Sequence, residues 1–214
     1  MTNNKLTTLY IVRHGETEFN VKKIMQGHCD SPLTLKGNEQ IASLAKKLQD
    51  IKFDAIFASD LPRAQKTAQI VALDKKLVVT TTKVLREKYY GKYEGKPSSH
   101  FFKDLQRLLQ QRGKLKTEER FKFKLKSDVE SDLEAVSRLI TFLRELAIGY
   151  PGKTILVVTH GGIMRCFLIK LGYTTYEELP TTGGLILNTA YIKIESDGVD
   201  FFIKDVVGVT KAKT

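Results

Sequence analysis

The chain has two cysteines, no tryptophan and no long apolar run. Cys29 and Cys166 are too few for a disulfide framework and lack the spacing of metal ligands, so we expect two reduced thiols. No apolar stretch approaches the about 18 residues of a membrane-spanning helix, so we expect no membrane partner. The polar start of the chain leads directly into a strand-like run without the pattern of a signal peptide, which indicates a cytoplasmic protein.

The chain nevertheless has enough apolar residues for a full core. Hydrophobic residues make up 42% of its 214 residues, and eleven Phe and eight Tyr add bulk, which excludes a disordered chain. The 35 Lys and Arg outnumber the 24 Asp and Glu, and the net charge is +11. This charge favours anionic partners such as phosphates or nucleic acid.

Short apolar runs alternate with helical patterns along the chain. The runs predict strands at residues 9–12, 54–58, 77–80 and 154–158, and a hairpin at 191–194 and 201–207. The helical patterns lie at 35–48, capped by Thr34, at 62–73, capped by Ser59 or Asp60, at 129–146 and at 163–171. This order predicts an α/β fold, a three-layer α/β/α sandwich with a mainly parallel sheet.

Residues 96–126 interrupt this alternation. They hold ten Lys and Arg against three Asp and Glu, a net charge of +7. Phe101, Phe102, Leu105 and Leu109 suggest one amphipathic helix, and residues 112–116 a loop. We interpret the segment as a small, helical, basic cap insertion in a single domain that comprises residues 1–214.

Two histidines follow predicted strands and precede glycines. His14 lies in Arg-His-Gly after the first strand, and His160 lies in His-Gly-Gly after a later one. In parallel sheets the site lies beyond the carboxyl ends of the strands, so both histidines can meet in one crevice. Arg13 and Arg63 supply guanidinium groups that bind phosphate oxygens, and Glu87 is a carboxylate just past the third strand.

Each of these features also has an ordinary structural explanation. A single histidine beside glycine is more often a helix cap or a satisfied polar group. Arg63 fits a solvated helix face, and Glu87 fits a surface charge cluster with Arg86 and Lys88. Spacing alone does not show that these side chains converge.

Five ordered blocks between residues 9 and 165 together resemble the signature of the histidine phosphatase superfamily, also called the phosphoglycerate mutase-like family. The blocks are LYIVRHGETEFN (9–20), QGHCDSPLTLKG (26–37), SDLPRAQKTA (59–68), LRE (85–87) with GKYEG (91–95), and VTHGGIMR (158–165). Residues 96–126 and those after Gly172 match only loosely.

The resemblance implies roles for individual residues. His14 corresponds to the nucleophile that becomes phosphorylated, and Glu87 to the proton donor. Arg13, Arg63 and His160 correspond to the remaining catalytic positions. The resemblance adds further phosphate-binding positions, of which Thr17 matches less closely: Thr17, Asn20, Gln26, Gly27 and Gly161, beside Arg13, Arg63 and His160. It implies no metal and no other cofactor.

The predicted activity is hydrolysis of small anionic phosphomonoesters through a phosphohistidine. His160-Gly161-Gly162 and the 73 positions from Glu87 to His160 favour a phosphatase, whereas the Tyr89-Tyr90-Gly91 run is similar to mutases, so mutase-type transfer is the alternative. A different class, an RNA- or polyanion-binding protein, would use the basic insertion, but without an RNA-binding motif we expect a lid and no nucleic acid. A homodimer is left open.

Overall fold

The computed structural model describes residues 5–73, 76–180 and 186–212, so the first four residues of the polar N-terminal segment lie outside the described part. Within these ranges the chain forms a six-stranded sheet in the order β3-β2-β4-β1-β5-β6. The strands are β1 (Thr7–Arg13), β2 (Ala55–Ser59), β3 (Val79–Thr82), β4 (Thr154–Thr159), β5 (Ile186–Ser196) and β6 (Phe201–Val209). The first four strands in this order are parallel, and β5 and β6 pair antiparallel, which confirms the mainly parallel sheet and the hairpin.

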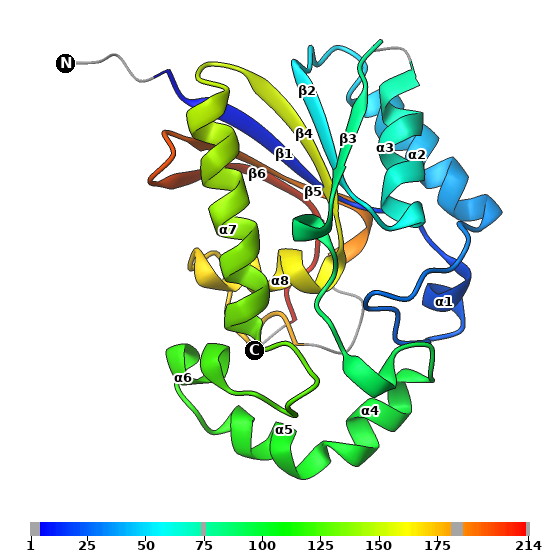
Figure 1. Cartoon of the computed structure of the whole chain (residues 1–214), viewed down its shortest axis with the longest axis vertical. Coiled ribbons are helices and arrows are strands. Elements are labelled where there is room, and N and C mark those ends of the chain that lie inside the picture. The colour runs from blue at the N-terminus through cyan, green and yellow to red at the C-terminus, as the bar shows by residue number, and fades with distance from the viewer. Residues whose placement is uncertain (1–4, 74–75, 181–185, 213–214) are drawn as a thin grey trace.

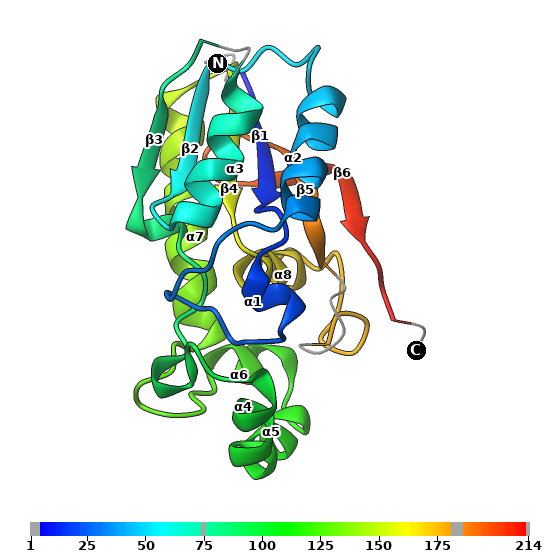
Figure 2. The same cartoon turned by 90° about the vertical axis from the view of Figure 1, so that its right-hand side faces the viewer.

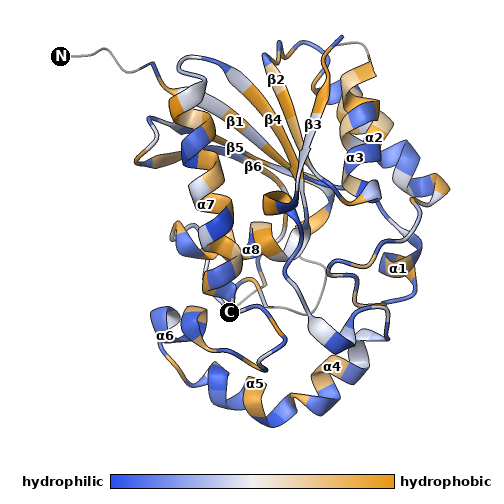
Figure 3. Cartoon of the chain, in the orientation of Figure 1, coloured by the Kyte–Doolittle hydropathy of each residue, from blue (hydrophilic) through white to orange (hydrophobic). Residues whose placement is uncertain are grey.

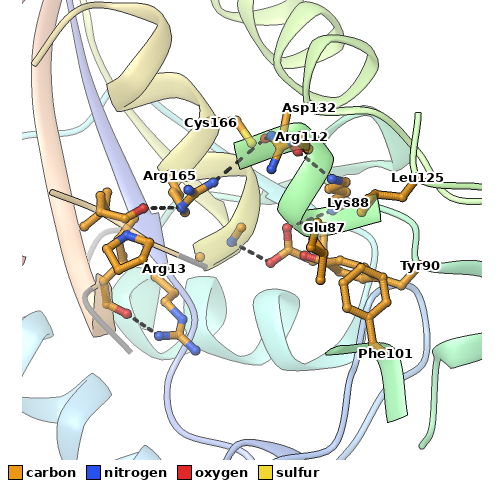
Figure 4. A pocket seen from close by; sticks show the side chains of 16 residues that line it. Arg13, Glu87, Lys88, Tyr90, Phe101, Arg112, Leu125, Asp132, Arg165 and Cys166 are labelled. Atoms are coloured by element: carbon orange, nitrogen blue, oxygen red, sulfur yellow. Dashed lines mark hydrogen bonds and ion pairs between the residues drawn. The ribbon is translucent and has the colours of Figure 1, made fainter. Parts of the chain in front are cut away.

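Helices cover both faces of the sheet. One face carries α2 (Leu35–Lys47) and α3 (Pro62–Ala72), and the other carries α7 (Asp132–Gly149) and α8 (Gly161–Lys170). Successive side chains of a strand point to opposite faces. In β4, Leu156 and Val158 therefore pack with α2 and α3, while Ile155 and Val157 pack with α7 and α8. Figure 3 shows this centre as apolar strands, flanked by helices α2, α3 and α7 that mix hydrophobic and hydrophilic residues.

The N-cap residues predicted from the sequence are correct for one helix and wrong for another. Thr34 caps α2 as predicted, and its hydroxyl accepts a hydrogen bond from the Gly37 amide at 2.9 Å. The prediction that Ser59 or Asp60 caps α3 is wrong, because the N-cap is Leu61, which makes no side-chain cap. The Asp60 carboxylate instead accepts two hydrogen bonds from Arg86, both at 2.7 Å.

The basic insertion forms three short helices rather than one. They are α4 (Ser98–Asp104), α5 (Gln106–Gly113) and α6 (Thr117–Lys122). The chain turns at the buried Leu105, so its apolar residues lie on two helices, and Arg112 belongs to α5 rather than to a loop. Figure 1 shows these helices below the end of the sheet at which β1, β2 and β4 finish. The insertion therefore lies over the carboxyl ends of the parallel strands.

Two smaller features complete the fold near this end. Helix α1 (Glu18–Val21) follows β1, and two single 3₁₀ turns, Lys83–Leu85 and Gly91–Tyr93, flank Glu87. In the described part of the chain, no helix combines the length and apolar character that crossing a bilayer requires.

Candidate active site

The two histidines meet because their strands are neighbours. Arg13 and Thr159, the last residues of β1 and β4, are partners in the parallel register. His14 and His160 follow them directly, and their ring centroids lie 5.2 Å apart. Both histidines are buried. The structure therefore brings the two distant histidines together, side by side.

The His14 ring has a defined orientation. Its Nδ1 lies 2.7 Å from the Gly15 carbonyl oxygen, which can only accept, so Nδ1 carries the proton and Nε2 keeps its lone pair. Burial lowers the pKa of His14 well below its ordinary value, and the charges of Arg63 and Arg13 lower it further. Burial and Arg63 also lower the pKa of His160. Both imidazoles are therefore neutral at pH 7.

Two arginines enter the site from different elements. Arg13, at the end of β1, donates from Nη1 to the Ile186 carbonyl, and burial lowers its pKa to about 10. Arg63, in the first turn of α3, is 2% exposed and donates to the carbonyls of Gly27 and Cys29 at 2.8 and 2.7 Å. Its remaining partner is the Asp30 carboxylate at 2.9 Å.

Unpartnered buried atoms concentrate at this place. In the described part of the chain, the buried side-chain nitrogen and oxygen atoms without a hydrogen-bond partner belong to four residues, namely Arg13, Gln26, Arg63 and His160. All four are residues that the sequence placed around a phosphate. Since buried polar groups are nearly always hydrogen-bonded, these atoms set this place apart from the rest of the described part of the chain.

Glu87 lies at the N-terminus of α8. Its carboxylate accepts hydrogen bonds from the amides of Gly162 at 2.7 Å, Ile163 at 2.9 Å and Lys88 at 2.8 Å. A helix N-terminus and three N–H donors stabilise a negative charge. A Cβ atom at Gly162 would lie 2.6 Å from a Glu87 oxygen, so the missing side chain makes room for the carboxylate.

The other predicted phosphate-binding residues surround the histidines. Thr17 is the N-cap of α1 and forms a capping box with Asn20. Gly27 has a φ of 51° and directs its carbonyl to Arg63, while a Cβ atom on Gly161 would lie 3.0 Å from Nε of Arg13. The structure thus links Gly27 to Arg63, Gly161 to Arg13 and Thr17 to Asn20.

Sequence reasoning missed several residues that hold this region together. Asn188 of β5 donates to the His14 carbonyl and to the Asn20 side chain, both at 3.2 Å. Arg138 of α7 donates to the carbonyls of Val84, Arg86 and Glu87 at 2.6 to 2.9 Å. Both side chains donate hydrogen bonds to backbone carbonyls of residues more than 50 positions away in sequence. A local sequence pattern does not predict such contacts.

A cavity of about 200 Å³ adjoins Glu87 between α8 and the cap. Its polar lining includes Arg13 and Glu87, and the cap contributes four of its residues, namely Phe101, Leu109, Arg112 and Leu125. Among the ten basic residues of the insertion, Arg112 lines this cavity and the lysines do not. Across the described residues, no group of three or more His, Cys, Asp or Glu side chains is arranged to hold a metal ion.

The family model of the histidine phosphatase superfamily (branch 1) matches residues 9–207. The chain belongs to this superfamily. It is 31% identical to the broad-specificity phosphatase YOR283W of Saccharomyces cerevisiae, over 95% of this chain and 86% of that protein. It is 33% identical to phosphoglycerate mutase-like protein 4 of Arabidopsis thaliana, over 73% of this chain and 67% of that protein.

A solved structure shares the whole architecture. YhfR of Bacillus stearothermophilus superposes with a TM-score of 0.80 at 29% identity, over 95% of this chain and 98% of that chain. The predicted fold class is therefore confirmed. The chain is an enzyme of the histidine phosphatase type, and the roles of its individual residues follow as proposals.

Proposed function

We propose that this enzyme is a metal-independent phosphomonoesterase that hydrolyses small anionic phosphorylated metabolites through a phosphohistidine on His14. The observation that carries the proposal is the set of unpartnered buried atoms on Arg13, Gln26, Arg63 and His160 around the neutral His14 ring. A phosphoryl group supplies negative oxygens that can accept hydrogen bonds from Nε of Arg13, Nε of Arg63 and one ring nitrogen of His160, whereas the Gln26 side-chain oxygen is itself an acceptor. The catalytic unit is the single domain of residues 1–214, with residues 96–126 as its cap.

In the first step, the lone pair of His14 Nε2 attacks phosphorus. The bond from phosphorus to the ester oxygen breaks, and the departing oxygen takes a proton from Glu87, which must enter this step in its protonated form. Arg13 and Arg63 stabilise the charge on the transferring phosphoryl oxygens, and His160 donates a hydrogen bond to them. The Nδ1 hydrogen bond to Gly15 keeps the His14 ring in the attacking orientation.

In the second step, water attacks the phosphohistidine and inorganic phosphate leaves. Glu87, now a carboxylate, accepts a proton from that water, and the Nε2 lone pair returns to His14. The amides of Gly162, Ile163 and Lys88 stabilise Glu87 in this ionised form. Gln26, Gly27, Asn20, Thr17 and Gly161 complete the phosphate pocket in this proposal.

The His14→Ala variant tests the covalent step. We expect loss of turnover, at least 10³-fold, because the variant has no nucleophile. Wild type incubated with a radiolabelled phosphodonor and quenched during turnover should carry an acid-labile label. His100→Ala is the matched control, since His100 is an exposed histidine of the cap and should keep both activity and label. A label on the His14→Ala variant would assign the nucleophile to another residue.

A further inference from the structure

Strand β5 contacts the backbone carbonyl of His14. The main-chain amide of Thr189 donates to this oxygen at 3.3 Å, and the side-chain amide of Asn188 donates to it at 3.2 Å. On the other side of the same peptide group, the Gly15 amide donates to the Thr67 hydroxyl at 3.2 Å. The peptide group between His14 and Gly15 is therefore held at both ends.

This peptide group determines where the His14 ring points. The carbonyl that accepts the hydrogen bond from His14 Nδ1, at 2.7 Å, belongs to Gly15, so a single glycine joins the ring to the oxygen that orients it. Glycine has the freest backbone of all residues, and a rotated peptide group would carry this carbonyl away from Nδ1. The contacts from β5 and Thr67 restrict that rotation and keep the proton on Nδ1 and the lone pair on Nε2.

Thr189 has a backbone conformation that its side chain disfavours. Its φ is 60°, in the left-handed region, which β-branched residues rarely adopt because Cβ crowds the backbone. Among the described residues other than glycine, only Lys23 and Lys76 share a positive φ. Such a conformation persists only where the surrounding structure imposes it, and it concentrates at functional sites.

The strained residue lies where β5 follows one neighbour and departs from the other. Strand β5 lies between β1 and β6. Its register along β1 has no break, and the bond from Thr189 to His14 continues it. Its register along β6 shifts, and residues 187–190 lie opposite Gly208 alone. The bulge against β6 therefore keeps β5 aligned with the residue that follows β1.

We propose that Asn188 and Thr189 are positioning residues of the nucleophile, and that the bulge in β5 brings their two amides onto the His14 carbonyl. This inference rests on the proposed role of His14 and extends it. Asn188 also donates to the Asn20 side chain at 3.2 Å, so the same amide group links His14 to α1. Both residues act through the backbone of His14 and not through the substrate.

Two substitutions at Asn188 test the side-chain contact. In single-turnover experiments with propyl phosphate, we expect Asn188→Ala to lower the rate constant of His14 phosphorylation about tenfold, the effect of one lost buried hydrogen bond, with an unchanged half-saturation concentration. Asn188→Asp keeps the shape but places acceptor oxygens against two other acceptors, so it should be slower still. If the residue only fills space, Asn188→Asp will be faster than Asn188→Ala, which overturns the proposal.

A matched control removes the same kind of contact elsewhere. The side-chain amide of Asn38, an exposed residue of α2, donates to the Thr34 carbonyl at 2.9 Å. Asn38→Ala should therefore keep the wild-type rate of phosphorylation. A loss in Asn38→Ala as large as that in Asn188→Ala would show a general effect on the fold and would overturn the positioning role.

The strain at Thr189 has its own test. Glycine adopts a positive φ without strain, so we expect Thr189→Gly to raise the melting temperature. Thr81→Gly, at an exposed threonine of β3, should lower it. Phosphorylation should slow less in Thr189→Gly than in Asn188→Ala, because the amide that contacts His14 remains. A melting temperature that falls in both glycine variants would overturn the assignment of strain.

The tautomer of His14 gives a measurement without turnover. In ¹⁵N spectra of the imidazoles, with the His14 signal assigned by its absence from His14→Ala, we expect wild type to carry the proton on Nδ1. Both Asn188 variants should shift it toward Nε2. An unchanged tautomer in both variants would overturn the positioning role alone. Failure of the proposed phosphatase function would instead appear as wild type that neither hydrolyses p-nitrophenyl phosphate nor forms a phosphohistidine.

Discussion

Gly162 has no side chain at the place that the Glu87 carboxylate occupies. A Cβ atom there would lie 2.6 Å from one carboxylate oxygen and 3.0 Å from the other. The atoms that must give way are the flexible end of a side chain and not backbone. A substitution should therefore move Glu87 and leave the fold in place.

We expect Gly162→Ala to lower kcat at least tenfold on alkyl phosphates and much less on p-nitrophenyl phosphate. The nitrophenolate leaves with little help from an acid, whereas in the proposed mechanism an alkoxide takes a proton from Glu87. Steady-state kinetics on both substrates checks this. Gly149→Ala, at a glycine with open space around it, is the control. Equal losses on both substrates would show that Gly162 does not act through the proton donor.

Helix α7 positions the segment that carries Glu87. Arg138 donates to the carbonyls of Val84, Arg86 and Glu87, and its guanidinium also pairs with Glu130 at 2.9 Å. Residues 86–90, between the two 3₁₀ turns, belong to no helix or strand. The three hydrogen bonds from Arg138 therefore hold the backbone of this segment, and with it Glu87, in place.

We expect Arg138→Lys to lower kcat on alkyl phosphates about tenfold and to raise amide hydrogen exchange in residues 84–89, because a lysine cannot reach three carbonyls at once. Arg144→Lys is the matched control on the same helix, where the side chain donates to the exposed Val199 carbonyl. Mass-spectrometric exchange together with kinetics measures both effects. A drop in melting temperature alone, with unchanged exchange and kcat, would reduce Arg138 to a structural residue.

The elements predictable from the sequence are those with a local cause. The apolar runs of β1, β2 and β4 and the cap of α2 depend on residues within one element, and they were predicted within a few positions. The three helices of the cap insertion were not predicted. The break between the first two of them lies at Leu105, which is buried against residues distant in sequence such as Tyr93 and Val129. The predicted N-cap of α3 was wrong for the same reason, because the Asp60 carboxylate accepts a hydrogen bond from Arg86, which lies 26 residues away in sequence.

The site shows the same division. His14, His160 and Glu87 lie in recognisable motifs, whereas their partners Asn188 and Arg138 reach them only through the tertiary fold. Their side chains contact backbone carbonyls or other charges contributed by separate elements. Patterns of residue type along one strand or helix do not predict such contacts.

At the scale of the whole molecule, the neutral histidines make stability depend on pH. The pKa values of His14 and His160 are lowered by burial in the folded state, whereas unfolded histidines titrate near about 6.5. Below that pH the unfolded chain binds protons that the folded chain does not, so acid favours unfolding. Above pH 6.5 both states are neutral at these positions and the contribution is constant.

We expect the free energy of unfolding to fall between pH 6.5 and pH 5 by up to about 1.4 kcal/mol per pH unit for each of the two histidines. Urea unfolding at several pH values measures the slope. The paired carboxylates, whose pKa values are lowered, lose their contribution only at more acidic pH. The double variant His14→Asn, His160→Asn should have a flatter profile in this window. An unchanged slope would place the acid sensitivity elsewhere.

The position of β1 in the sheet has a consequence for the order in which the protein is made. This strand carries Arg13 and His14, yet its two neighbours are β4 and β5, which begin at Thr154 and Ile186. On the ribosome, the first strand to emerge must wait for most of the chain before either edge is paired. Such distant pairing is slow and exposes strand edges during synthesis. The surroundings of His14 are therefore assembled among the last parts of the molecule, so a chain released before β4 and β5 lacks both neighbours of the strand that carries this histidine.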